Sequence, residues 1–241
     1  MIRDPRGGHN RKQINESFFR TWTPQMSYVL GLLLADGAIE NTIESSRTCY
    51  IQFTSIHKEF LEDIKRCLSS DHKIATRKSH TGFIRGLKIT SKESYNLRIG
   101  NKIMYNDLKD LGLTPKKANR LIFPQVPPHL FPFFLRGYFD GDGCVYLHKQ
   151  QTSKRQLIAI VFTSCCNVFL QRISSSINDF LSIPGRVYWQ SNAFRLQYTG
   201  SNAQHILSFL YSSLNKAPFL KVKYHKYAAY LKSSGYSLSA V

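Results

Sequence analysis

The sequence predicts an α+β fold built from two similar halves, each with the element order αββαββα. Three features predict it: an apolar helical run ending in Asp-Gly, a Phe-Thr-Ser triplet that leads into a helix, and a later segment of alternating residues. Their copies are Tyr28–Gly37 and Phe133–Gly143, Phe53–Ser55 and Phe162–Ser164, and Tyr95–Ile99 and Phe194–Tyr198. Because the copies follow one another in the same order, we expect two pseudo-symmetric halves that share the Asp-Gly helices as their interface.

The two Asp-Gly helices carry small residues four positions apart, which lie on one helical face. These residues are Gly31 and Ala35 in the first helix, and Gly137 and Gly141 in the second. Without side-chain bulk on that face, the helices can pack almost backbone to backbone. We expect Gly37 and Gly143 to end the helices in the left-handed capping conformation, which would bring Asp36 and Asp142 to adjoining helix ends.

Asp36 and Asp142 are the candidate functional residues and metal ligands. Carboxylates at the C-terminal ends of two helices oppose both helix dipoles and repel each other, so local electrostatics disfavours the pair. Such exceptions are typical of functional sites, and carboxylate oxygens suit a divalent cation such as Mg²⁺. A single Asp-Gly is commonly only a turn, but its repetition favours the functional interpretation. A calcium loop fits poorly, because Cys144 stands where the next ligand should be.

The elements of the first half follow in order. Thr23-Pro24 predicts the start of the first helix, since Pro is favoured in the first helical turn. Ile51 and Phe53 alternate with Gln52, which predicts a half-buried strand, and residues 58–68 have the helical period. The remaining expectations are strands around His72–Lys78 and Ser94–Gly100 and a helix near Lys102–Leu111.

A proline-rich segment is expected to separate the halves. Residues 123–128 contain three prolines, which cannot continue a helix and favour an extended connection. The predicted organisation is a basic N-terminal segment at 1–21, a first half at 22–122, this linker, and a second half at 129–241.

Composition and charge indicate the class of partner. The 241 residues carry a formal net charge of +18 and the pI is near 9.8. Such a surface predicts a polyanionic partner, most commonly nucleic acid, although charge alone also fits a basic protein that binds none. With no apolar run of membrane-spanning length and no secretory apolar region, we expect an intracellular, DNA-associated protein of the cytoplasm, nucleoid or an organelle matrix. Five cysteines without metal-ligand spacing are expected to be reduced thiols.

The Asp-Gly helices also carry a family resemblance. Val29–Gly37 and Leu135–Gly143 resemble the two LAGLIDADG motifs of single-chain homing endonucleases. Leu34 stands where the family often has an acid, whereas Asp140 keeps it, which argues against a symmetric role for Asp140. The resemblance covers most of the chain, because the segments after each motif also match the family's order of strands and helices.

The resemblance implies a fold, an activity and a cofactor. The strands of both halves would combine into one saddle-shaped antiparallel β surface over duplex DNA. A monomer would hydrolyse phosphodiester bonds in both strands of a long double-stranded target, with divalent metal held by Asp36 and Asp142. Mg²⁺ is the expected ion, Mn²⁺ a substitute, and Ca²⁺ is expected to support binding rather than cleavage.

Two lysines are candidates for a supporting catalytic role. Lys117 and Lys223 recur at the same spacing as the two aspartates. In the resembled family, a lysine in this region helps to polarise the attacking water or to stabilise the phosphate. Lys116 and Lys221 are close rivals, and a solvated helix lysine is an equally good interpretation of either candidate alone. Gln52 and Ser55, with Ser164 as the counterpart in the second half, are weaker candidates for orienting water, as polar residues at this place do in the resembled family.

Outward-facing strand residues are the candidate DNA contacts. Side chains alternate across a strand, so one face can pack on helices while the other presents donors and acceptors to base edges in the major groove. The positions opposite the apolar ones are Gln52, Lys73, Arg77, Arg98, Tyr188, Gln190, Arg195 and Gln197. Each alone fits an ordinary solvated residue equally well, because strand parity is easily misjudged by one position.

Two functional classes compete with the endonuclease. Some proteins that resemble this chain act as RNA-binding maturases, which help an intron to splice, so intron RNA is the alternative partner. A DNA-binding regulator on the same fold is a third interpretation. Both acidic residues are present, which favours the nuclease, because neither splicing assistance nor simple binding requires them.

Overall fold

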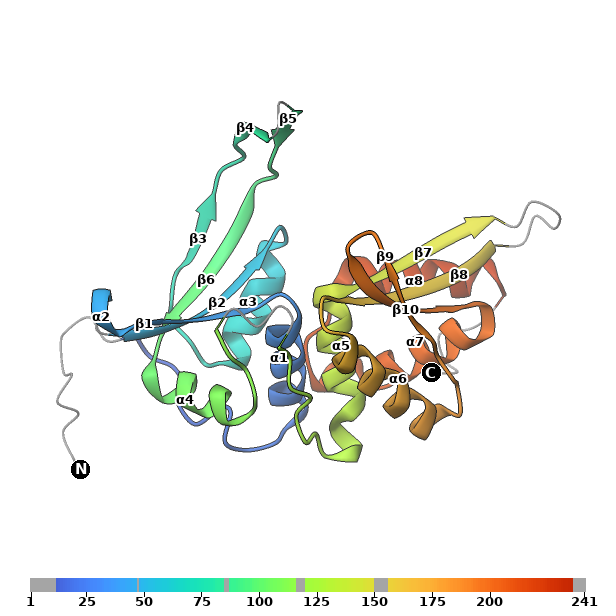
Figure 1. Cartoon of the computed structure of the whole chain (residues 1–241), viewed down its shortest axis with the longest axis horizontal. Coiled ribbons are helices and arrows are strands. Elements are labelled where there is room, and N and C mark those ends of the chain that lie inside the picture. The colour runs from blue at the N-terminus through green and yellow to red at the C-terminus, as the bar shows by residue number, and fades with distance from the viewer. Residues whose placement is uncertain (1–11, 47, 85–86, 116–119, 150–155, 236–241) are drawn as a thin grey trace.

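The computed structural model describes residues 12–46, 48–84, 87–115, 120–149 and 156–235. Figure 1 shows two halves, each of helices and strands, on either side of a central pair of helices, α1 (Pro24–Ala35) and α5 (Phe131–Asp142). The first half contains α1 (Pro24–Ala35), β1 (Ala38–Thr42), α2 (Ile43–Ser46), β2 (Thr48–Ser55), α3 (Lys58–Cys67), β3 (Ile74–Arg77), β4 (Thr81–Ile84), β5 (Leu87–Thr90), β6 (Ser94–Gly100) and α4 (Lys102–Asp110).

Within the described residues, the second half repeats the main elements of this order, lacks counterparts of α2 and of the β4–β5 hairpin, and adds the helix α8 (Lys221–Ser233) at its end. It begins with a short 3-10 helix (Pro128–Leu130) and continues with α5 (Phe131–Asp142), β7 (Gly143–Lys149), β8 (Gln156–Ser164), α6 (Asn167–Leu181), β9 (Val187–Gln190), β10 (Ala193–Thr199), α7 (Gly200–Tyr211), a 3-10 helix (Leu214–Lys216) and α8 (Lys221–Ser233). The predicted α+β class and the duplicated αββαββα order are confirmed.

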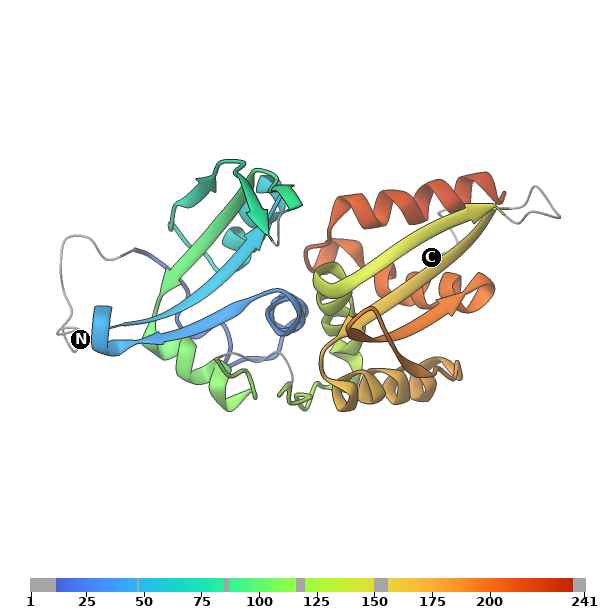
Figure 2. The same ribbon diagram turned by 45° about the horizontal axis from the view of Figure 1, so that its top comes forward.

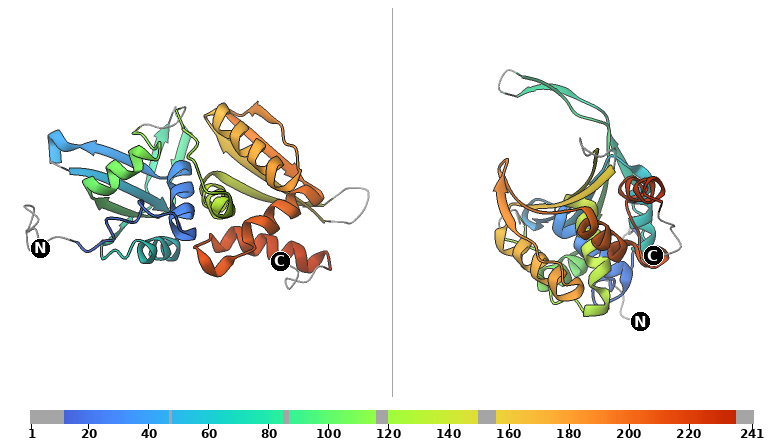
Figure 3. Two further views of the ribbon diagram at one scale, coloured as in Figure 1. Left: turned by 90° about the horizontal axis from the view of Figure 1, so that it is seen from below. Right: turned by 90° about the vertical axis from the view of Figure 1, so that its right-hand side faces the viewer.

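The two halves contain equivalent four-stranded antiparallel sheets. The strand orders are β1-β2-β6-β3 and β7-β8-β10-β9, which are the same order within each half. Helices α3 and α4 pack on the first sheet, and α6 and α7 on the second. Figure 2 shows the strands of both halves flanking α1 and α5, and the right-hand view of Figure 3 shows how strongly they curve. The helix-free faces of the sheets are the predicted polar faces.

Helices α1 and α5 meet backbone to backbone. Every residue of α1 from Met26 to Ala35 is buried. A Cβ atom added to Gly31 would lie 2.1 Å from the carbonyl oxygen of Phe134, and one added to Gly137 would lie 2.0 Å from that of Tyr28. Neither position has room for a side chain, so the predicted small-residue contact is confirmed.

The predicted left-handed caps are wrong. Neither Gly37 nor Gly143 has a positive φ, and Gly143 is extended at φ −92° and ψ 163°. Strand β7 begins at Gly143 itself and β1 begins directly after Gly37, so each glycine lies where the chain passes from a helix into a strand. Glycine is needed here for space instead, because added Cβ atoms would lie 2.4 Å from Cδ2 of Leu33 and 2.2 Å from Cδ2 of Phe139, respectively.

The start of α1 agrees with the sequence, whereas some later elements were not predicted. The Thr23 hydroxyl accepts a hydrogen bond of 3.1 Å from the Met26 amide, which caps the helix as expected. The β4–β5 hairpin was not predicted, because each strand has only four residues and β5 is exposed along its whole length instead of alternating in burial. Figure 1 shows this hairpin extending away from α1 and α5. Among the described residues, no helix is long and apolar enough to cross a membrane.

Candidate active site

The two motif aspartates lie at adjoining helix ends. Asp36 is the C-terminal cap of α1, and Asp142 is the last residue of α5. Between them, Gly141 approaches α1 so closely that an added Cβ would lie 3.2 Å from the Asp36 amide nitrogen and 3.5 Å from the Asp36 Cβ. The Asp36 side chain is exposed, and Asp142 is half-buried. The close helix contact therefore positions one acid from each half beside the same seam.

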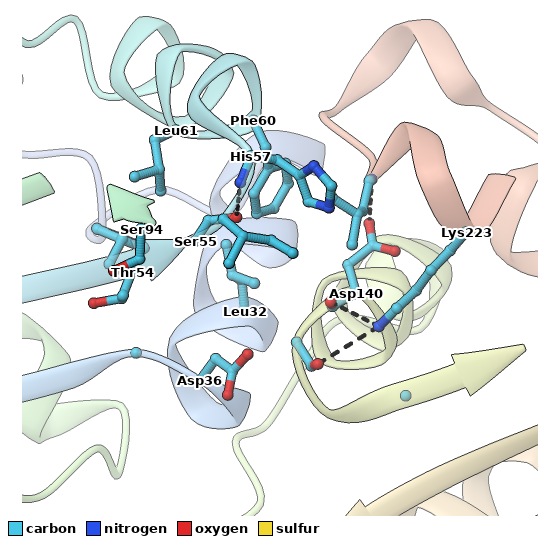
Figure 4. A pocket seen from close by; sticks show the side chains of 16 residues that line it. Leu32, Asp36, Thr54, Ser55, His57, Phe60, Leu61, Ser94, Asp140 and Lys223 are labelled. Carbon is cyan, nitrogen blue, oxygen red and sulfur yellow. Dashed lines mark hydrogen bonds between the residues drawn. The ribbon is translucent and has the colours of Figure 1, made fainter. Parts of the chain in front are cut away.

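A cavity of about 470 Å³ opens beside Asp36. It is lined from both halves, by the end of β2 and the start of α3 on one side and by α5 and the start of α8 on the other. Figure 4 shows Asp36, Ser55, His57 and Lys223 around this space, with Lys223 entering from α8. His57 has no such counterpart in the second half, where the Phe-Thr-Ser triplet is followed by Cys165 and Cys166.

Lys223 holds the end of α5 instead of projecting freely into the cavity. Its Nζ donates to the carbonyl oxygens of Phe139 at 2.7 Å, Asp140 at 2.8 Å and Gly141 at 3.5 Å. A cation on these final carbonyls satisfies orphan acceptors and interacts favourably with the helix dipole. Burial lowers the pKa of Lys223, and nearby acids, Asp140 first, oppose that shift. The predicted catalytic lysine is thus a helix cap that lies next to the two motif aspartates.

Asp140 links three helices. Its Oδ2 accepts hydrogen bonds from the Tyr28 hydroxyl of α1 at 2.7 Å and from the Leu220 amide, just before α8, at 2.8 Å. Burial raises the pKa of this carboxyl group, and Lys223 is the strongest of the groups that oppose the shift. The equivalent residue in the first half, Leu34, is fully buried and apolar. The asymmetric role expected for Asp140 has its structural basis in this network.

Arg136 is a buried cation that the sequence interpretation missed. It is fully buried, and its guanidinium donates to the carbonyl oxygens of Leu210 at 3.2 Å, Ser213 at 3.4 Å and Ala217 at 3.0 Å. These carbonyls belong to the end of α7 and the segment after it. A charged residue inside an otherwise apolar helix was the available signal, since a buried Arg requires several acceptors.

The predicted DNA-facing residues of the first sheet lie on its helix-free face. Gln52 is directly opposite Arg98 in the β2–β6 pair, and their strand neighbours Ile51 and Ile99 are buried. Arg77 is opposite Ser94 of β6, and Ser94 lies on the same face of β6 as Asn96 and Arg98. Lys73 is exposed just before β3. The predicted parity of these strands is therefore correct, while contact with DNA stays a prediction.

The four candidates in the second sheet also share one face. Arg195 is opposite Tyr188 in the β9–β10 pair, while Leu196 and Tyr198 point to the core. Tyr188 donates its hydroxyl hydrogen to Oε1 of Gln197 at 2.7 Å, and Arg195 donates to Oε1 of Gln190 at 3.1 Å. These bonds limit the orientations of the amide and guanidinium groups before any ligand is present.

The remaining predicted residues are differently placed. Lys117 and its rival Lys116 lie outside the described residues. The Ser55 hydroxyl accepts from the His57 amide at 3.1 Å, and the Ser164 hydroxyl accepts from the Cys166 amide at 3.0 Å. Both serines therefore stabilise the turn into the following helix, which is a sufficient structural reason for their repetition.

The acid pair has the donor chemistry that Mg²⁺ prefers. Mg²⁺ usually takes one or two carboxylates and completes its shell with waters and substrate phosphates. Within the described ranges, no group of three or more His, Cys, Asp or Glu residues could hold a metal. Asp36 and Asp142 would therefore leave most coordination positions to water and phosphate oxygens, which fits an ion bound together with a nucleic acid.

Family comparison agrees with this geometry in both halves. Residues 135–234 match the model described as LAGLIDADG endonuclease, and residues 23–105 match that of a LAGLIDADG-like domain. The chain belongs to the LAGLIDADG endonuclease family and contains two such domains.

A curated relative shares part of the sequence. The chain is 26% identical over 153 residues to the reverse gyrase of Methanocaldococcus jannaschii. The match covers 63% of this chain but only 8% of that protein. Because the match covers so little of the relative, the activity of that whole protein does not carry over to this chain.

Solved structures share the fold across most of the chain. The homing endonuclease I-GzeII in complex with its DNA target has a TM-score of 0.59 at 14% identity, over 89% of this chain and 90% of that one. I-WcaI bound to its DNA recognition sequence gives 0.58 at 15% identity, over 88% and 91%. I-SmaMI bound to uncleaveable DNA gives 0.56 at 18% identity, over 87% and 89%. At these identities the similarity shows the fold.

Proposed function

We propose that this chain is a site-specific DNA endonuclease that uses divalent metal to hydrolyse both strands of a long duplex target. The observation that carries the proposal is that Asp36 and Asp142 lie at the adjoining C-terminal ends of α1 and α5. Because each half supplies one acid, a single chain completes the pair, and we propose that the protein acts as a monomer. The net charge of +18 supports a polyanionic substrate.

In this proposal, different parts of the site bind the metal, fix the two helix ends and bind the duplex. Asp36 and Asp142 would hold Mg²⁺, which when bound stabilises charge on the scissile phosphate and lowers the pKa of a bound water. Lys223 fixes the last turn of α5 and so restricts the position of Asp142. The Gly31 and Gly137 contact restricts the spacing of the two helix ends. The outward faces of the two sheets would bind the duplex, with sequence read from base edges.

Aspartate substitutions test the catalytic assignment. Asp36→Asn and Asp142→Asn remove one anionic ligand each, and we expect each to lower Mg²⁺-dependent cleavage by about 10²-fold or more. The substrate is obtained by selecting cleaved duplexes from a random library with the unsubstituted protein. Duplex binding in Ca²⁺ is measured in parallel and should largely persist. Asp179→Asn, at an exposed acid on α6, is the matched control.

Other outcomes would favour the competing classes. Full cleavage by either aspartate variant would refute the assignment of the acid pair. If the unsubstituted protein cuts no duplex but accelerates splicing of an intron RNA, the maturase proposal replaces the nuclease. Sequence-specific duplex binding without cleavage in Mg²⁺ or Mn²⁺ would instead favour a regulator.

A further inference from the structure

One acidic side chain lies among the predicted DNA contacts of the first sheet. Glu40 of β1 is directly opposite Tyr50 of β2, and Arg98 of β6 is opposite Gln52 of β2. These registers bring Glu40, Tyr50 and Arg98 together on the helix-free face. The three residues come from three different strands, so only the folded sheet assembles them.

Arg98 is held from two directions. Its Nη2 lies 2.8 Å from Oε2 of Glu40, in a salt bridge whose partners are 45% and 43% exposed. Its Cζ also lies 3.7 Å from the centroid of the Tyr50 ring. The ring covers one face of the planar guanidinium, while the carboxylate engages one of its two Nη groups. Most of the five N–H donors of Arg98 remain available along the edge of a plane whose orientation is restricted.

This arrangement is difficult to explain by stability or by phosphate binding. An exposed ion pair contributes little to folding, so Glu40 is not needed to hold the sheet together. A carboxylate beside an arginine also repels phosphate and competes for the guanidinium, which lowers affinity for any DNA sequence. The second sheet differs, because the residue equivalent to Arg98 is the neutral Gln197, which accepts a hydrogen bond from the Tyr188 hydroxyl. Arg195, two residues earlier in β10, is held by the neutral amide of Gln190.

Recognition of a base accounts both for the restricted guanidinium of Arg98 and for the carboxylate of Glu40 beside it. Arg pairs bidentately with O6 and N7 of guanine, and the pairing requires the guanidinium to lie in the plane of the base. A guanidinium fixed before binding loses less conformational entropy when it meets that edge. A negative neighbour also discourages contact with a nearby phosphate, so Arg98 is favoured in base contacts over backbone contacts.

We propose that Glu40 is a specificity-determining positioning residue that holds Arg98 for reading a guanine in the half-site bound by the first sheet. The inference rests on the proposed DNA-binding function. It assigns to Glu40 an effect on base preference that is opposite in sign to its effect on general affinity for DNA.

The test compares base preference and affinity in matched variants. Bound duplexes are selected from a random library in Ca²⁺, and the preference at each position is measured for the unsubstituted protein, Glu40→Gln and Arg98→Ala. We expect one guanine position to be preferred about tenfold or more, and this preference to fall below about threefold in both variants. Affinity for unrelated duplex should rise about two- to fivefold in Glu40→Gln and fall in Arg98→Ala.

Two controls separate this effect from charge and stability. Glu59→Gln makes the same charge change at an exposed acid on α3, where Glu59 pairs with Lys221, and should leave base preference unchanged. In the Arg98→Ala background, Glu40→Gln should cause no additional loss of preference, because the residue that it positions is gone. Thermal unfolding of both Glu40→Gln and Glu59→Gln should match that of the unsubstituted protein.

Each contrary result has a distinct meaning. If Glu40→Gln keeps the full guanine preference, or lowers affinity equally for all duplexes, Glu40 does not position a base-reading arginine. If Glu40→Gln lowers the preference further in the Arg98→Ala background, Glu40 acts without Arg98 and the proposal is overturned. If the unsubstituted protein binds no duplex at all, the proposed function itself fails.

Discussion

Several residues at or near the contact between α1 and α5 make polar interactions that are not evident from the mostly apolar motif sequences. Tyr28 and Asp140 form a buried hydrogen bond of 2.7 Å between α1 and α5. Arg136 and Lys223 place cations on the C-terminal carbonyls of α7 and α5. Each of these groups would be costly to bury alone, so each depends on its partners for its place in the fold.

Tyr28→Phe should destabilise the protein in a pH-dependent way. Losing the hydroxyl leaves Asp140 without one of its two donors, which should lower the free energy of unfolding by about 1–3 kcal/mol at neutral pH. Burial, then Asp140, raises the pKa of Tyr28 well above its ordinary value. The unfolded tyrosine therefore ionises first, so this residue's contribution to stability is full below about pH 10 and declines at higher pH.

Urea unfolding between neutral and alkaline pH measures this effect. The stability difference between the unsubstituted protein and Tyr28→Phe should narrow as pH rises above about 10. Tyr211→Phe is the control, because its buried hydroxyl has no hydrogen-bond partner among the described residues and its pKa is also raised by burial. Tyr211→Phe should therefore change the free energy of unfolding little at neutral pH. A difference for Tyr28→Phe that stays constant with pH would contradict the linkage.

Lys223→Met should reveal how far this lysine serves as a cap. We expect the free energy of unfolding to fall by about 2 kcal/mol, since charged hydrogen bonds to α5 carbonyls are lost while an apolar stem remains. Lys221→Met removes an exposed lysine from the same helix and should change stability by less than about 0.5 kcal/mol. Denaturant unfolding checks both. Equal stability in the two variants would show that the Lys223 contacts do not hold α5 in place.

The elements that decide the geometry of the site are α1 and α5. Their glycines allow carbonyl oxygens of one helix to occupy the space of a side chain on the other. The spacing of Asp36 and Asp142 then follows from backbone contact, which is stiffer than contact through flexible side chains.

Adding one methyl group at this contact should strongly destabilise the protein. Gly31→Ala and Gly137→Ala place Cβ atoms 2.1 and 2.0 Å from opposing carbonyl oxygens, so the helices must separate. We expect each to lower the free energy of unfolding by about 3 kcal/mol or more. Gly82→Ala in β4 is the control, with its nearest neighbour 3.6 Å away. Thermal unfolding compares them, and an unchanged melting temperature in Gly31→Ala would refute the backbone contact.

At the scale of the whole molecule, neither half buries its own motif helix. The face of α1 that is covered by α5 would be exposed in a fragment of residues 1–122, and the reverse holds for residues 129–241. Such an apolar surface favours association or aggregation. The continuous chain keeps the two faces at high effective concentration.

Separated halves should therefore depend on each other. We expect each fragment to be poorly soluble alone and the two to form a one-to-one complex when produced together. Size-exclusion chromatography and circular dichroism measure the complex and its folding. Gly137→Ala in the second fragment should prevent the complex. Two fragments that each remain monomeric and folded would contradict a shared core.

The periodicity of the sequence was sufficient to predict the structure where interactions between nearby residues decide the conformation. Leu97 and Ile99 are buried while Arg98 is exposed, as alternation along a strand requires. Thr23 caps α1, and the small residues of α1 and of α5 lie on one face of their helix, because both features follow from chemistry within a few residues. The parity of the eight candidate DNA contacts was predictable for the same reason, except for Lys73, which precedes its strand.

The sequence by itself determined the duplicated fold, the motif helices and the placement of one acid from each half at their ends, because repeated patterns constrain elements near in sequence. Only the tertiary structure decided that Gly37 and Gly143 are required for space, that Lys223 and Arg136 cap helices distant in sequence, and that Glu40 holds Arg98. The contacts of Lys223, Arg136 and Glu40 join residues far apart along the chain, and their partners are fixed by how sheets and helices pack. Gly37 and Gly143 instead lie against Leu33 and Phe139, four residues earlier, and this crowding depends on how the chain leaves each helix to enter a strand.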